Sequence, residues 1–135
     1  MIRYKRPDIK NAISILEAAK REMEFTLTIS VKEEAGTTII RNIYESFRML
    51  GDALLTSKGI EVSDHLEQIG ELFKLSVKTE RPIQIIDNLR RLRHNMNYYG
   101  YKPNIEEVKD AILIAKACFI PLYNEVSKKI KESNK

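Results

Sequence analysis

Apolar residues recur along most of the chain at intervals of three and four, which is the spacing of an amphipathic helix. No segment shows the sustained alternation of apolar and polar residues that is typical of a strand. Ser, Asn, Pro and Gly stand where the apolar pattern starts and stops, as they do at helix ends. The pattern predicts five helices, which cover about residues 7–29, 37–58, 63–76, 82–99 and 105–130.

Four of these helices are long, and the third, over residues 63–76, is short. The connections between them are also short, and short connections make successive long helices antiparallel neighbours. The sequence therefore predicts an all-α fold, an antiparallel up-and-down bundle of four long helices plus one short helix. Its 135 residues fit a single domain over residues 1–135.

Composition and charge narrow the class of protein. Apolar residues make up 43% of the chain and charged residues 31%, which is typical of a globular domain. The net charge of +4 comes largely from the two ends, MIRYKR and KKIKESNK, and permits an acidic partner such as RNA without requiring one. There is no long apolar run and no signal peptide, so we expect a cytoplasmic protein with no membrane contact.

Several kinds of chemistry are not indicated. The single cysteine, Cys118, lies in an apolar segment and is expected to be buried and inert. His65 and His94 fall on different helices, and no His, Cys or carboxylate cluster has metal-ligand spacing. The glycines form no phosphate-binding loop; Gly51 and Gly70 are expected to mark close helix packing. The sequence predicts no metal and no cofactor.

The segment LRRLRHNMNYYG, residues 89–100, concentrates the candidate chemistry. Helical spacing places Arg90, Arg93 and Asn97 along one margin of the apolar stripe, with His94 and Tyr98 further out. At such a margin the stem of Arg93 can be buried while its guanidinium reaches a cleft. A structural role is the alternative: Arg93 could pair with a carboxylate on a neighbouring helix, and Asn97 could bind the last carbonyls of its own helix.

Three segments in this order, SDHLEQIGELF, LRRLRHNMNYYGYKP and VKDAILIAKACFIPLYNEV, resemble the HEPN superfamily. The resemblance implies an all-α domain and a two-fold homodimer that brings the polar motifs of the fourth helices to a shared cleft. Active members are metal-independent ribonucleases. Other members look like RNA- or nucleotide-binding modules, or like partners of small nucleotidyltransferases in toxin–antitoxin pairs.

The resemblance is incomplete at its catalytic position. Arg93 matches the family arginine and His94 takes the polar position after it, so the family histidine falls at Asn97, Tyr98 or Tyr99. None of these can replace a histidine, because metal-free RNA cleavage needs an acid and a base that titrate near neutrality. Arg93 can still hold a phosphate, Asn97 can donate to it, and Tyr98 can stack on a base.

Three hypotheses follow. The favoured one is an RNA- or nucleotide-binding homodimer, as part of a toxin–antitoxin or nucleotidyltransferase-associated system, whose binding residues are Arg90, Arg93, Asn97 and Tyr98. The second is a metal-independent endoribonuclease that uses Arg93 and His94 as catalytic residues. The third is a chain that only docks onto a small nucleotidyltransferase protein and has no nucleic-acid site.

Overall fold

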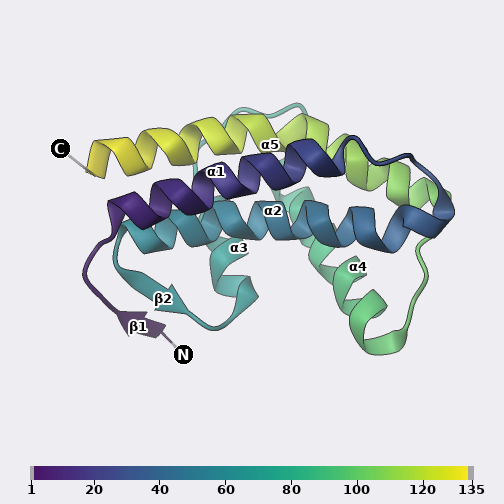
Figure 1. Cartoon of the computed structure of the whole chain (residues 1–135), viewed down its shortest axis with the longest axis horizontal. Coiled ribbons are helices and arrows are strands. Elements are labelled where there is room, and N and C mark those ends of the chain that lie inside the picture. Colours follow the sequence, from purple (N-terminus) through teal and green to yellow (C-terminus); the bar gives the residue numbers. More distant parts are fainter. Residues whose placement is uncertain (1, 134–135) are drawn as a thin grey trace.

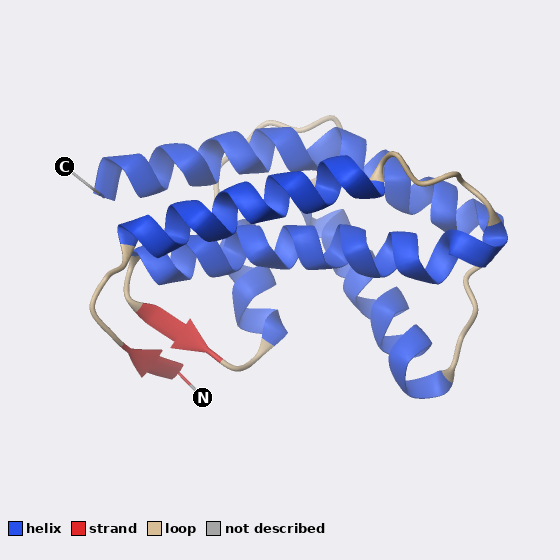
Figure 2. Cartoon of the chain, in the orientation of Figure 1, coloured by secondary structure: helices blue, strands red, loops and turns tan. Residues whose placement is uncertain are grey.

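The computed structural model describes residues 2–133, apart from the side chain of His65, and this part of the chain is mostly helical (Figures 1 and 2). Helices α1, α2 and α5 lie side by side along the long axis of the molecule, and α3 and α4 lie against α2 on one side of that layer (Figure 1). The five helices are α1 (Ile9–Thr26), α2 (Gly36–Ser57), α3 (His65–Phe73), α4 (Ile86–Tyr99) and α5 (Ile105–Ser133).

The core lies where α1, α2 and α5 meet, and α4 adds Ile86 and Leu89 to it. Phe47 of α2 and Phe119 of α5 pack edge to face with ring centroids 5.6 Å apart. Cys118 of α5 is buried, as the sequence predicts. The apolar stripes of the long helices are thus buried in the core. Polar side chains that could bind a ligand lie at the margins of these stripes and at the helix ends.

A two-stranded antiparallel ribbon corrects the prediction that the chain has no strand. Strand β1 (Ile2–Tyr4) pairs with β2 (Ile60–Val62), drawn as red arrows in Figure 2. Arg3 lies opposite Glu61, and their side chains form an ion pair of 3.7 Å. Each strand has only 3 residues, which is too short to give a readable alternation in the sequence.

The helix ends follow local capping chemistry. Helix α1 begins two residues later than predicted, because the Asp8 carboxylate accepts a hydrogen bond of 3.0 Å from the backbone N–H of Asn11. Asp64 caps α3, and accepts from the Leu66 N–H at 2.9 Å. A 3-10 turn over Glu33–Ala35 precedes α2, and another over Ile83–Ile85 precedes α4.

Two glycines end helices as predicted, since Gly59 and Gly100 have φ of 74° and 64°. Gly51 allows α3 to approach α2, because a Cβ there would lie 1.9 Å from the backbone oxygen of Gln68. The same prediction is wrong for Gly70, where a Cβ would meet nothing within 4 Å.

The mostly helical fold is therefore confirmed. The regular up-and-down bundle stays a prediction, because α3 and α4 lie at an angle to the other three helices (Figure 1). Within the described residues, no helix has both the length and the apolar character needed to cross a bilayer.

Candidate nucleic-acid interface

Two polar strips face each other across the contact between α2 and α4. Each strip consists of three residues of one helix, at spacings of three and four, which places them on one helical face. Arg41 near the start of α2 meets Asn97 near the end of α4, and Tyr44 meets Arg93 one turn further along. We call this set the arginine seam: Arg41, Tyr44 and Arg48 from α2, and Arg90, Arg93 and Asn97 from α4.

Direct contacts hold the seam in register. Arg41 Nε donates a hydrogen bond of 3.0 Å to Asn97 Oδ1. The guanidinium carbon of Arg93 lies 5.2 Å from the centre of the Tyr44 ring, which is within the range of a cation–π contact. Tyr44 is fully buried, so its ring provides a fixed base under the half-buried Arg93 side chain.

Arginines from both helices surround Tyr44 closely enough to act on its titration. Burial raises the pKa of the Tyr44 hydroxyl, while Arg93, Arg90 and Arg48 act in the opposite direction. The three guanidiniums therefore lie close enough to the buried Tyr44 for their charges to act on it, and they place positive charge along the contact between α2 and α4.

Carboxylates neutralise only part of this charge. Glu45 holds Arg48 through hydrogen bonds of 2.9 and 2.5 Å. Asp87 accepts a hydrogen bond of 2.7 Å from Arg90, and this bond holds the pKa of the Asp87 carboxyl below its usual range. Arg41 and Arg93, by contrast, form no ion pair with any residue that the structure describes. These two guanidiniums keep charge and donors for an outside anion.

Exposed aromatic side chains follow the seam at the end of α4. Tyr98 and Tyr99 are 72% and 76% exposed, and Tyr101 is 42% exposed. The ring of His94 lies 4.6 Å from that of Tyr98 and 5.8 Å from that of Tyr99, centroid to centroid. The seam ends at Asn97, which binds Arg41, and the exposed tyrosines begin at the next residue, Tyr98.

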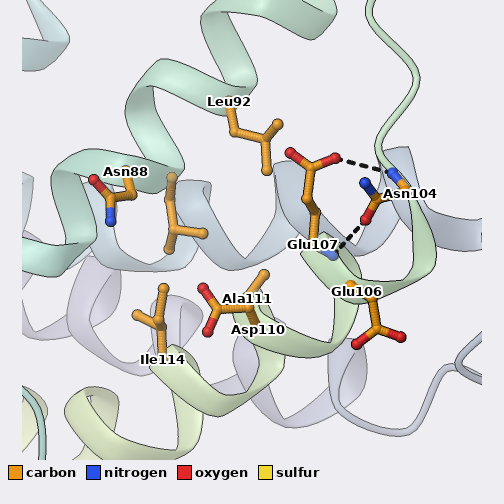
Figure 3. Close-up of a pocket in the computed structure, with 9 residues that line it drawn as sticks. Asn88, Leu92, Asn104, Glu106, Glu107, Asp110, Ala111 and Ile114 are labelled. Atoms are coloured by element: carbon orange, nitrogen blue, oxygen red, sulfur yellow. Dashed lines mark hydrogen bonds between the residues drawn. The ribbon is translucent and has the colours of Figure 1, made fainter.

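On the side of α4 that faces α5, the nearby charged residues are carboxylates of α5. A pocket of about 340 Å³ lies there, and Figure 3 shows Asn88 and Leu92 of α4 opposite the carboxylates of α5. These carboxylates are partly engaged: Glu107 accepts from the Asn104 N–H at 3.0 Å and from the Tyr101 hydroxyl at 2.6 Å. Asp110 pairs with Arg81 at 3.0 Å. An anion is therefore attracted to the α2 side of α4 and repelled from the α5 side.

The predicted site residues divide into two groups. Arg93 and Asn97 contact α2 and Arg90 lies close enough to act on Tyr44 of α2, whereas the exposed side chains of His94 and Tyr98 contact each other. Arg93 packs on Tyr44 and has no described carboxylate partner, and Asn97 accepts from Arg41.

Sequence reasoning missed the α2 half of the seam. Arg41, Tyr44 and Arg48 lie in a helix whose apolar stripe gave no reason to look further. One signal was available: arginines and carboxylates recur along that helix at intervals of four, three and four, at Arg41, Glu45, Arg48 and Asp52.

Comparison with protein families, with curated proteins and with solved structures finds no match to this chain.

Proposed function

We propose that the chain is a HEPN-like bundle that binds single-stranded RNA along the arginine seam, with the exposed tyrosines as a stacking surface. The observation that carries the proposal is the pair Arg41 and Arg93, two guanidiniums on facing helices without a carboxylate partner among the described residues. The resemblance of residues 89–103 to the HEPN superfamily supports the same assignment.

The seam is suited to a phosphate. Arg41 uses only Nε for Asn97, so its two terminal nitrogens remain for an anion. Arg93 contacts the Tyr44 ring, and no ion pair ties its guanidinium to a carboxylate among the described residues. Two guanidiniums on facing helices can bind the oxygens of one phosphate or of two successive phosphates.

The tyrosines favour single strands over duplexes. In single-stranded RNA the bases are unstacked and can lie against aromatic rings, while a basic groove follows the backbone. Tyr98 contacts the His94 ring, but at 72% exposure it leaves most of its surface open to a base. Stacking beside a phosphate contact is thus the expected mode of binding.

The test is fluorescence anisotropy of a labelled oligouridine with the wild type and the Arg93→Ala variant. Loss of one charge-assisted contact should weaken binding about 10- to 100-fold. Arg21→Ala is the matched control, because Arg21 is an exposed arginine of α1 and forms no ion pair with a described residue. It removes the same charge and should change affinity less than about twofold.

Equal binding by the Arg93→Ala and Arg21→Ala variants would reject the seam. Absence of binding by the folded wild type at low salt would instead favour the docking partner of a nucleotidyltransferase. The endoribonuclease hypothesis makes a separate prediction, which is metal-free RNA cleavage that disappears in His94→Ala. We expect intact RNA, because within one chain His94 lies against Tyr98 rather than beside the seam.

A further inference from the structure

A second polar pocket, of about 380 Å³, lies where the β-ribbon meets the start of α1 and the end of α2. Residues from β2, α1, α2 and α3 line it, and the N-terminal segment passes across it, held by a hydrogen bond of 2.6 Å from Lys5 N to Gly59 O. Gly59 is required for this close approach, because a Cβ there would lie 2.2 Å from the Lys5 oxygen. The volume falls in the range of small-molecule sites.

Most charged groups of this pocket are already engaged. Lys5 forms an ion pair with Glu61, and Asp8 accepts from the Asn11 N–H at 3.0 Å. Two groups remain. Arg6 lines the pocket and forms no ion pair with a described residue. The Asp52 side chain, from α2, lines the same pocket.

Asp52 is supported from behind by Gln68. The Gln68 side chain hydrogen-bonds Asp52, and its Oε1 accepts a bond of 2.8 Å from Arg48. Because Gln68 is only 6% exposed, its amide is fixed, and it presents the carboxylate in one orientation. Burial raises the pKa of Asp52, against the opposing effects of Arg48 and the Gln68 bond, so this carboxylate gains from further donors.

We propose that this pocket binds a small ligand that carries a planar pair of N–H donors for Asp52 and an anionic group for Arg6. A carboxylate accepts two parallel N–H bonds, as in a fork-to-fork pair. The edge of guanine offers such a pair next to a phosphate, and free arginine offers it next to a carboxylate. Ile15, Ile60 and Val62 line the pocket and provide apolar walls for a flat group.

The experiment is isothermal titration of the whole chain with guanosine monophosphate and with L-arginine. Adenosine monophosphate is the first comparison, because adenine sets a ring-nitrogen acceptor against the carboxylate. Agmatine is the second, because it keeps the guanidinium of arginine but lacks the anionic group. We expect guanosine monophosphate or L-arginine to bind at least tenfold more tightly than its comparison compound, and the ligand that binds identifies the source of the donor pair.

Variants assign the binding to the pocket. Asp52→Asn should weaken it at least tenfold and Arg6→Gln at least threefold, while the α1 controls Glu24→Gln and Arg21→Gln leave it unchanged. Asp52→Asn should be at least as stable as the wild type. The pKa of Asp52 is raised in the folded chain, so its charged carboxylate lowers the free energy of unfolding at neutral pH, and a neutral asparagine removes this cost. Binding should also weaken as the pH falls, and should begin to do so at a higher pH than an ordinary aspartate would give, because the pKa of Asp52 is raised.

The proposal is independent of RNA binding at the seam, so Arg93→Ala should leave this affinity unchanged. It is overturned if neither ligand binds at millimolar concentration, if the ligand that binds does so no more tightly than its own comparison compound, or if Asp52→Asn has no effect on that binding.

Discussion

Tyr123 shows how one side chain can make stability depend on pH. Its hydroxyl donates a hydrogen bond of 2.5 Å to Glu17, so it ties α5 to α1, and Lys20 lies 5.1 Å from its ring centre. Burial, and then the Glu17 bond, raise the pKa of Tyr123 to about 12. An unfolded tyrosine titrates near pH 10.

We expect this contact to be lost at high pH. Folding binds the phenolic proton more tightly, so the stabilisation is complete below about pH 10 and falls as the pH rises toward 12. The free energy of unfolding of the wild type should therefore decrease relative to that of Tyr123→Phe across this window. Denaturation in urea at several pH values measures the difference, and a constant difference would contradict the assignment.

At the residue scale, the α4 half of the candidate site could be predicted from the sequence, and the α2 half could not. The α4 residues Arg93 and Asn97 stood out because Arg, Asn and Tyr are crowded into a few positions of one helix. Arg41 lies 56 residues away from Asn97 in the chain, and only the packing of α4 on α2 brings them together. Periodicity reports which face a residue occupies and carries no information about its partner across a helix contact.

At the scale of elements, the contact between α2 and α3 depends on the missing side chain of Gly51. Gly51→Ala would place a methyl group against the Gln68 backbone, which cannot move without shifting α3. We expect a loss of about 1–3 kcal/mol in the free energy of unfolding. Gly70→Ala is the matched control, because that position is open and alanine favours a helix by about 1 kcal/mol.

Urea denaturation of both variants tests this pair. Opposite signs are expected, with Gly51→Ala less stable and Gly70→Ala equally or more stable than the wild type. Equal effects at both positions would mean that α3 does not pack as closely as described.

Helices were predictable as elements, and their limits were less so. Each long helix buries an apolar stripe of many residues, which leaves a repeated signal in the sequence. The limits depend on single hydrogen bonds, such as the one that Asp8 accepts from Asn11, and several residues near each end could make an equivalent bond. The β-ribbon depends on the return of residues 2–4 to residues 60–62, a contact that no local pattern specifies.

At the scale of the whole molecule, the resemblance to the HEPN superfamily implies two copies. We expect light scattering to give a mass of twice 15.7 kDa. A monomer at micromolar concentration would contradict the dimer while leaving the seam of each chain intact, because all six of its residues belong to one chain.

Salt tests the seam in the same assembly. The logarithm of the RNA association constant should fall linearly with that of the salt concentration, by about 0.7 for each phosphate neutralised. Replacing both Arg41 and Arg93 by alanine should make this slope shallower by about 1.4, the value for two contacts. An unchanged slope would show that the phosphates are bound elsewhere, for example at the lysine-rich end of α5.

The contact of Arg93 with the Tyr44 ring has a consequence for the rates at which the proposed RNA would bind and dissociate. An arginine in an internal ion pair must break that pair before it can bind a phosphate. The carboxylate left unpaired then costs free energy and slows the exchange. When Arg93 moves away from the neutral Tyr44 ring, no charge is left unpaired. Arg93 can swing toward an arriving nucleotide chain and later return, so rapid turnover of occupants is what this construction favours.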